Sequence, residues 1–357
     1  MPKLVRKFLL SVMREFLYRK KFKSLISQKC DLTNGSSARF VLFGSPEYNN
    51  LGDHAIAFAI LTFLRSSFPN VEIIEIPESK ILNDFGQVKD ALFATDIICL
   101  VGGGNFGNEY MDQRTVRNLA MSYFETNPII IFPQSIFYTK SIMGKIALKH
   151  DRKIIKKSKN TYVFTRDRLS FEYLKSNFKG CNALCTPDIV LSLADYIEFP
   201  EVTRKEVLFC IRNDVESRLS SEDKALLKKH FTTYREKDTC LPYEISISQR
   251  SEEINNFLLE LTKCKLVITD RLHGAIFCAI TKTPCIIFNN YNHKIKGIAE
   301  WLKNCSYVFL CDSVSSFDKI LSEIDTTESE NSTPTWKSHF APLKDVLSKL
   351  VNDMENI

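Results

Sequence analysis

Short apolar segments alternate with helical segments along this chain, and this pattern constrains the fold more than any other feature. After residue 38, strand-like runs such as 40–43 and 96–101 alternate with helical patterns such as 54–66. Consecutive parallel strands need a crossover, usually a helix, so the alternation predicts a parallel sheet covered on both faces. Other expected strands are 71–76, 129–132 and 162–164, and other expected helices are 145–157 and 170–176.

A second series of the same kind begins near residue 205. We expect strands at 207–211, 243–247, 265–268, 284–288 and 306–310, and helices at 223–230 and 252–264. The polar stretch 190–205, which contains Pro200, is the best boundary. The sequence thus predicts two α/β domains, 38–195 and 205–312, facing a cleft where open α/β sheets bind ligands. A tail, 313–357, would carry a terminal helix at roughly 340–352.

Composition excludes several classes of protein. The 357 residues are 44% hydrophobic and 25% charged, as in ordinary soluble proteins. No apolar run approaches the roughly 20 residues needed to span a bilayer, and the N-terminus lacks the pattern of a signal peptide. The 11 cysteines are scattered singly through apolar segments, without zinc-site spacing. We therefore expect a cytoplasmic protein with buried thiols and no metal.

Positive charge is concentrated at one end of the chain. Residues 1–30 carry nine Lys and Arg and a single acid, Glu15, whereas the net charge of the whole chain is only +6. The near-neutral remainder argues against a nucleic-acid partner. Apolar residues at helical spacing predict an amphipathic helix over 1–30. Residues 1–24 would lie on an anionic membrane surface or dock on the protein's own body or a partner, and the basic cluster favours the membrane.

The run 269–274, Thr-Asp-Arg-Leu-His-Gly, is the most informative motif. It follows the apolar strand 265–268 and opens an apolar helix, so free backbone N–H groups favour an anion there. Arg271 adds a planar fork of donors suited to carboxylate or phosphate. His273 can move a proton near neutral pH. This motif predicts chemistry on an anionic substrate.

Two further cations fall near the same rim. Arg212 follows the first strand of the second series directly, and Lys294 lies just beyond the strand at 284–288. Either residue alone could be a solvated surface residue or an ion-pair partner. Together with Arg271 they favour a site for a dianion.

Two motifs of the first series also stand at strand ends. In 49–53, Gly52 permits close backbone approach, and Asp53 either caps the following helix or acts as a base on a sugar hydroxyl. The stretch 102–107 holds four glycines in six residues and predicts a turn that meets a ligand or serves only the fold. No acidic residue about 20 positions later supports a dinucleotide site.

Taken together, the motifs resemble the polysaccharide pyruvyl transferase family. They occur in the family's order over roughly residues 40–305. The matching elements are NNLGD (49–53), GGGN (102–105), PQS (133–135), TRDRLSFEYL (165–174), TPD (186–188), TDRLHG (269–274) and KIKG (294–297).

The resemblance implies two Rossmann-like domains of the GT-B type, with the acceptor on the first and the donor on the second. It implies transfer of the pyruvyl unit of phosphoenolpyruvate onto two hydroxyls of a sugar, forming a cyclic ketal without metal or cofactor. The basic N-terminal helix lies outside the resemblance and would suit a lipid-linked oligosaccharide acceptor at the inner face of the membrane. The implied catalytic residues are His273, Arg271 and Asp53, with Asp53 across the cleft. Donor binding would use Arg212, Arg271, His273, Gly274 and Lys294. Acceptor binding would use Asn50, Gly52, Gly103, Gly104, Asn105 and Gln134.

Two other functions fit the same pattern less well. One is a glycosyltransferase of this architecture with a nucleotide-sugar donor, against which the lack of a recognisable acidic pair for ribose weighs modestly. The other is a non-catalytic saccharide-binding subunit. Such a subunit would have little use for Arg212, Arg271 and His273 on one rim.

Overall fold

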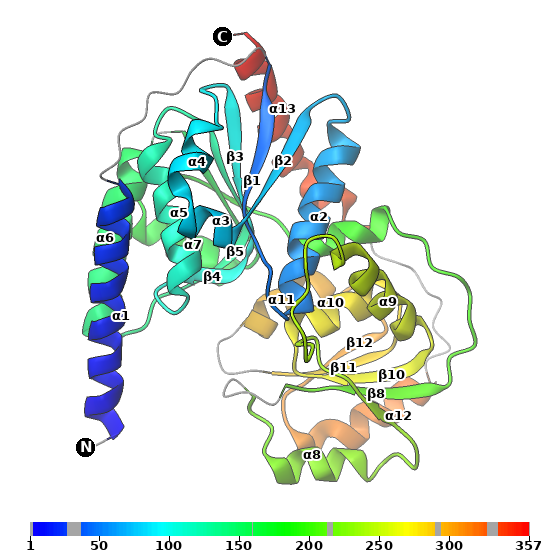
Figure 1. Cartoon of the computed structure of the whole chain (residues 1–357). Coiled ribbons are helices and arrows are strands. Elements are labelled where there is room, and N and C mark those ends of the chain that lie inside the picture. The colour runs from blue at the N-terminus through cyan, green and yellow to red at the C-terminus, as the bar shows by residue number, and fades with distance from the viewer. Residues whose placement is uncertain are drawn as a thin grey trace. The chain divides into compact units, whose positions relative to one another are not determined.

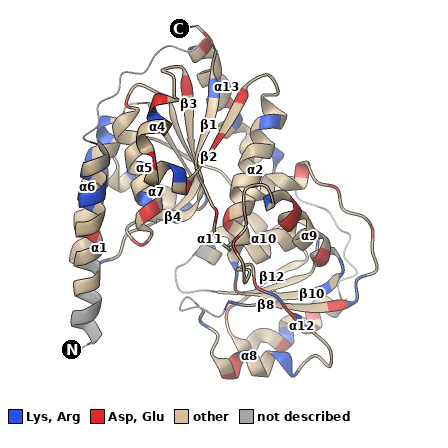
Figure 2. Ribbon diagram, in the orientation of Figure 1, with Lys and Arg blue, Asp and Glu red and all other residues tan. Residues whose placement is uncertain are grey.

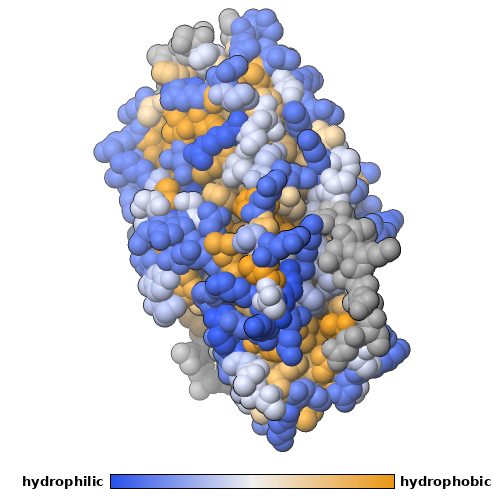
Figure 3. Space-filling view, turned by 90° about the vertical axis from the view of Figure 1, so that its right-hand side faces the viewer, coloured by the Kyte–Doolittle hydropathy of each residue, from blue (hydrophilic) through white to orange (hydrophobic). Residues whose placement is uncertain are grey.

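The computed structural model describes residues 3–26, 37–158, 160–212, 217–289, 294–326 and 335–356. The chain forms two compact units (Figure 1). Unit 1 comprises Met1–Glu47, Phe63–Thr186 and Ala341–Ile357, and unit 2 comprises Tyr48–Thr62 and Pro187–Phe340. On the face shown in Figure 3, hydrophilic residues prevail and apolar patches lie between them, as on an ordinary protein surface.

Unit 1 is built on a parallel sheet of seven strands. Its order is β2-β1-β3-β5-β6-β7, and β4 pairs with β5. Strands β3 and most of β5 are buried along their length, as expected for a sheet covered on both faces. The strands are β1 (Arg39–Ser45), β2 (Glu72–Pro77), β3 (Asp96–Leu100), β4 (Gly103–Gly107), β5 (Ile129–Phe137), β6 (Thr161–Thr165) and β7 (Asn182–Cys185).

Helices connect and cover these strands. They are α1 (Lys3–Ile26), the end of α2 (Leu51–Ser67), α3 (Glu78–Asn83), α4 (Phe85–Asp90), α5 (Met111–Tyr123), α6 (Ile142–Lys157), α7 (Arg168–Asn177) and α13 (Ala341–Glu355). The sequence pattern had not singled out α5. Its buried residues include four polar ones, Arg114, Thr115, Arg117 and Asn118, and buried polar residues weaken an apolar periodicity.

Unit 2 contains a second parallel sheet, ordered β12-β11-β10-β8-β9. The strands are β8 (Glu206–Cys210), β9 (Arg235–Glu236), β10 (Cys264–Thr269), β11 (Cys285–Phe288) and β12 (Val308–Cys311). The helices are η1 (Ile189–Asp195), α8 (Ser221–Lys228), α9 (Arg250–Thr262), α10 (Leu272–Ile280), α11 (Lys294–Leu302), η2 (Val314–Ser316), α12 (Phe317–Thr326) and η3 (Lys337–Phe340). The strand expected at 243–247 is wrong: that stretch is irregular, and the edge strand is β9.

The division into units follows different boundaries from those expected. Residues 48–62 belong to unit 2, because Leu51 N donates to Thr239 O at 2.8 Å and Leu241 N to Asn49 O at 2.9 Å. The terminal helix α13 belongs to unit 1, where it packs near β3 and buries Leu343 and Leu347. The order of the elements along the chain does not indicate that residues 48–62 belong to unit 2 or that α13 belongs to unit 1.

Helix α1 docks on α5 and α6 of its own unit through a polar and aromatic face. Its buried residues include Glu15, Tyr18 and Phe22. Glu15 accepts from Arg114 Nη1 at 2.7 Å, and the Arg114 guanidinium lies 4.0 Å from the centre of the Tyr18 ring. The apolar face that the sequence predicts for this helix is therefore not the face that packs on α5 and α6.

A buried ionic network lies beneath this helix. Arg114 is fully buried and donates through Nε and Nη2 to Asp151, which also accepts from Asn118 and Tyr138. Burial alone would raise the pKa of Asp151, but the His150 hydrogen bond and the Arg114 charge outweigh it and lower that pKa. Because the folded pKa is depressed, the stabilisation is present above the unfolded value of about 3.9 and is lost as pH falls through the folded value.

We expect Arg114→Met to destabilise unit 1 by about 3–5 kcal/mol, because it leaves two buried carboxylates without their shared partner. Urea unfolding measures the change. Arg168→Met, which removes an exposed arginine from α7, is the matched control and should shift stability by no more than about 0.5 kcal/mol. If Arg114→Met lowered the free energy of unfolding no more than Arg168→Met does, the buried network would not contribute to stability.

Candidate active site

Two neighbouring strands of unit 2 end side by side and present the predicted cations. Strands β8 and β10 pair in parallel, with Cys210 opposite Thr269. Thr269 Oγ1 donates to Cys210 O at 2.6 Å and accepts from Arg271 N at 3.0 Å. This local bonding fixes where the chain turns from β10 into α10. The backbone of Arg212 and that of Arg271 therefore lie on one carboxyl edge, as predicted.

Asp270 holds this edge together. It is fully buried, and its carboxylate accepts from Arg212 N at 2.8 Å and from Ser217 Oγ at 2.9 Å. Burial raises the pKa of Asp270, although these hydrogen bonds oppose the rise. We had assigned Asp270 no role from the sequence. Its place directly after a buried strand was the available signal.

Arg271 is held by an acid that the sequence did not reveal. Its Nε and Nη2 donate to Asp238 Oδ1 and Oδ2 at 2.7 and 2.6 Å, in a bidentate pair. The arginine is 8% exposed. Such a pair fixes the plane of the guanidinium and uses one edge of its fork. Asp238 stands in an irregular segment after β9, where no local pattern marks it.

His273 lies in the first turn of α10, between a carboxylate and a glycine. Its Nε2 is 3.6 Å from Asp188 Oδ2, and the Asp188 side chain is 1% exposed. Nε2 has no hydrogen-bond partner among the residues that the structure describes. A Cβ placed on Gly52 would lie 2.3 Å from His273 Nδ1. The imidazole therefore packs against the Gly52 backbone and faces an acid on its other side.

The 49–53 loop thus belongs to the same unit as His273, and not to the opposite domain as expected. Asn49 Nδ2 donates to Leu241 O at 2.7 Å, and Asn50 forms an antiparallel bridge with Cys240. This backbone pairing ties the loop to the segment that follows Asp238. The structure therefore gathers Gly52, His273 and the Arg271–Asp238 pair within unit 2.

Asp53 has side-chain partners and does not cap α2. Its Oδ2 accepts from Asn50 Nδ2 at 2.7 Å and from the Tyr48 hydroxyl at 3.2 Å. The cap is supplied by Asn50, whose Oδ1 accepts from Gly52 N at 3.0 Å. This occupies both polar atoms of the Asn50 side chain. The next residue, His54, is buried between Tyr48 O and Arg250 Nε.

The two remaining donor candidates have different outcomes. Gly274 is buried in α10, and a Cβ there would lie 2.6 Å from Thr269 Oγ1, so the glycine allows the helix to start against its strand. Lys294 is the first residue of α11, but its side chain lies outside the described part of the structure. Its role stays a prediction.

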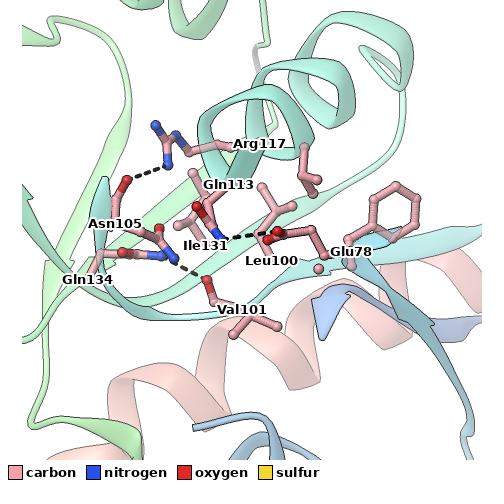
Figure 4. A pocket seen from close by; sticks show the side chains of 11 residues that line it. Glu78, Leu100, Val101, Asn105, Gln113, Arg117, Ile131 and Gln134 are labelled. Atoms are coloured by element: carbon pink, nitrogen blue, oxygen red, sulfur yellow. Dashed lines mark hydrogen bonds between the residues drawn. The ribbon is translucent and has the colours of Figure 1, made fainter. Parts of the chain in front are cut away.

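The other acceptor candidates lie in unit 1. The glycine stretch expected to be a turn is largely strand β4, which begins at Gly103, where φ is 118°. Gly103 pairs with Gln134 of β5, and that strand runs through the PQS motif instead of ending at it. Asn105 and Gln134 line a small pocket together with Arg117 of α5 (Figure 4). Sequence reasoning missed Arg117.

Comparison with known proteins identifies the chain. The family described as polysaccharide pyruvyl transferase matches residues 50–293, about two thirds of the sequence. The chain belongs to this family. It is a transferase of polysaccharide biosynthesis.

Two relatives match most of the chain. The chain is similar to general stress protein 30 of Bacillus subtilis, with 34% identity over 85% of this chain and 90% of that protein. It is also similar to pyruvyl transferase 1 of Schizosaccharomyces pombe, with 29% identity over 80% of this chain and 75% of that protein. Both similarities extend beyond the residues that the family match covers.

A solved structure shares the architecture. A functionally uncharacterised protein from Klebsiella pneumoniae has a TM-score of 0.55 and 20% identity, covering 88% of this chain and 100% of its own. That likeness bears on the fold alone. Two Rossmann-like α/β units of the GT-B type form this transferase. Among the described residues, no helix is both long and apolar enough to cross a bilayer.

The contact between Gly52 and His273 decides whether Gly52→Ala stabilises or destabilises the protein. Without the contact, Gly52→Ala in the first turn of α2 would stabilise the helix by roughly 0.5–1 kcal/mol. With it, the added methyl overpacks the imidazole and should destabilise unit 2 by about 1–3 kcal/mol. Urea unfolding of the two single variants and of Gly52→Ala/His273→Ala forms the test.

In that double variant the truncated side chain leaves room for the methyl, so the loss should largely disappear. Strictly additive effects of the two substitutions would contradict the packing described here.

Proposed function

We propose that this transferase moves the pyruvyl unit of phosphoenolpyruvate onto two hydroxyls of one sugar, forming a cyclic ketal and releasing phosphate. The observation that carries the proposal is the setting of His273, which is packed on Gly52, faces Asp188 and stands on the rim of Arg271. An imidazole of this kind suits a reaction that moves protons on an anionic substrate.

The charge of this donor matches the rim. Phosphoenolpyruvate carries a phosphate and a carboxylate, so it needs several cationic or N–H donors. Arg271 would supply a positive charge beside the donor, and α10 would offer the backbone N–H groups of its first turn. Arg212 and Lys294 are the other proposed donor ligands.

The proposed reaction has two steps. In the first, protonated His273 gives its proton to the methylene carbon while a sugar hydroxyl attacks the neighbouring carbon, and that hydroxyl's proton passes to a base. In the second, another hydroxyl of the same sugar attacks this carbon, the C–O bond to phosphate breaks, the proton of that hydroxyl passes to the departing phosphate, and the ketal closes.

Asp53 is the proposed base for the acceptor hydroxyl. It follows Gly52 in the chain, and its carboxylate already accepts from Asn50 and Tyr48. These hydrogen bonds would hold it in place. A sugar hydroxyl would be its third donor, within the capacity of a carboxylate.

The direct test is release of phosphate from phosphoenolpyruvate with galactose, glucose and N-acetylmannosamine acceptors. We expect acceptor-dependent release that falls about 10²–10⁴-fold in His273→Ala, the range for a lost general acid. His230→Ala removes a histidine from another place in unit 2 and is the matched control, with nearly unchanged release. Undiminished release in His273→Ala would remove that residue from the chemistry. Turnover of a nucleotide-sugar instead would favour the glycosyltransferase.

We also propose that α1 places the enzyme on the anionic inner face of a cytoplasmic membrane, where a lipid-linked acceptor would be found. Five large apolar side chains on this helix are exposed: Leu9 47%, Leu10 42%, Met13 53%, Phe16 65% and Leu17 54%. They recur at helical spacing on the side that Glu15, Tyr18 and Phe22 do not use. Exposed basic residues, coloured blue in Figure 2, follow them: Arg19, Lys20, Lys21 and Lys23. Apolar residues beside basic ones suit anionic lipid.

Sedimentation with vesicles of anionic or neutral lipid tests this placement. The wild type should bind anionic vesicles, more weakly at high salt, and Phe16→Glu/Leu17→Glu should lose most of that binding. Ile142→Glu/Leu169→Glu is the matched control, because those side chains are 62% and 63% exposed elsewhere in unit 1. Equal binding by the two variants, or binding independent of lipid charge, would contradict the proposal.

A further inference from the structure

An open pocket on the surface of unit 1 lies between α6 and the end of α7. Its wall is formed by Arg152 and Lys156 of α6 and by residues 176–179, and its volume is about 320 Å³. None of these residues belongs to the candidate active site. Since one water molecule takes about 30 Å³ of liquid, the pocket has room for a ligand of roughly ten heavy atoms. Two linked phosphate groups have that size.

Positive charge collects at this pocket. Arg152, Lys156 and Lys179 line it and are exposed, and no acidic residue is among the residues of its wall. In the described part of the chain, none of these three cations forms an ion pair with a carboxylate. The protein therefore does not relieve their mutual repulsion, and an anion in the pocket would be attracted by all three.

Arg152 is held in place by a neutral partner. Its Nη2 donates to Asn177 Oδ1, and Asn177 Nδ2 in turn donates to Tyr173 O at 2.9 Å. This pair of hydrogen bonds joins α6 to α7 at the pocket and orients the guanidinium. Because an amide carries no charge, it orients the arginine without neutralising it. The remaining N–H groups of the fork are left for a ligand.

Helix electrostatics explains only part of this cluster. The exposed charged residues of α6, which is marked in blue in Figure 2, are all basic: Lys145, Lys149, Arg152, Lys153, Lys156 and Lys157. The helix dipole favours cations in the last turn, which accounts for Lys156 and Lys157. It does not account for Arg152, which precedes that turn, or for a pocket that joins cations from two segments of the chain.

We propose that this pocket binds a phosphate-bearing anion, and that a diphosphate fills it best. The fork of Arg152 would donate to one phosphate, and the ammonium groups of Lys156 and Lys179 would act as point charges on the other. A single carboxylate would neutralise only one of the three cations. The inference goes beyond the proposed reaction and does not depend on it, since the proposed donor ligands lie in unit 2.

Calorimetric titration with inorganic diphosphate, at constant ionic strength and with a chelator present, tests the site. We expect Lys156→Gln/Lys179→Gln to bind about tenfold or more weaker than wild type, the size of a lost charge-assisted hydrogen bond. Lys145→Gln/Lys149→Gln is the matched control, because it removes the same charge from exposed positions of α6 outside the pocket wall. Its affinity should stay within about twofold of wild type.

A second pair of variants separates a built site from general surface charge. Asn177→Asp places a carboxylate beside the Arg152 guanidinium and lowers the net charge by one. The new ion pair should compete with the ligand, so diphosphate affinity should fall about tenfold or more. Lys145→Gln makes the same change in net charge and should change affinity by less than about twofold. The melting temperature shows whether both variants are folded.

Phosphate groups are carried by lipids as well as by soluble molecules, and vesicles distinguish these sources. The test uses the Phe16→Glu/Leu17→Glu protein, in which the proposed contact of α1 is removed, and vesicles that contain phosphatidic acid, whose head group is a phosphate monoester. Binding that is lost on adding Lys156→Gln/Lys179→Gln would assign the pocket to lipid phosphate. Diphosphate binding without such vesicle binding would assign it to a soluble phosphate.

Four results would overturn the proposal. The first is no detectable binding of diphosphate by wild type. The second is the same affinity and stoichiometry in wild type and in Lys156→Gln/Lys179→Gln, which would place the bound diphosphate elsewhere. The third is an equal loss in the pocket variant and in its matched control, which would mean that net charge alone is sensed. The fourth is tighter binding of citrate than of diphosphate, which would assign the pocket to carboxylates.

Discussion

The approach of the Gly52 backbone to the His273 ring is the constraint on which the rest of the site depends. It requires a residue without Cβ, and it requires the 49–53 loop to leave the sheet of unit 1 and pair with residues 239–241 of unit 2. That pairing also positions the segment carrying Asp238, which holds Arg271. One close contact therefore links the histidine, the loop and the arginine on the rim of β8 and β10.

Three buried arginines show how differently this chain treats the same charge. Arg114 is surrounded by Asp151 and Glu15, and the result is a docked helix α1. Arg271 forms a bidentate pair with Asp238 at the end of β10. Arg117 has a carbonyl and an aromatic ring but no hydrogen-bonded acid. Because burying charge is costly, the paired arrangement around Arg114 stabilises the fold.

Much of the fold follows from the sequence because parallel strands buried on both faces read as apolar runs. The runs at 96–100, 207–210 and 265–269 are strands for this reason. The family motifs also led to His273 and Arg271. The positions of the 49–53 loop and of α13 did not follow, because the backbone pairing of the loop with residues 239–241 and the packing of α13 near β3 leave no local pattern. Asp238, Asp188 and Arg117 gain their roles from tertiary neighbours, so residue spacing could not assign them.

The most direct test of the account is the isotope content of the product formed in deuterated water. If His273 protonates the methylene carbon and a second hydroxyl then closes the ketal, the product methyl group should carry one deuterium from solvent, as NMR and mass spectrometry would show. A product that keeps the methylene double bond would mean that only phosphate was displaced and no ketal formed. A methyl group without deuterium would mean that its proton did not come from an exchangeable group such as His273. Either result would contradict the proposed mechanism.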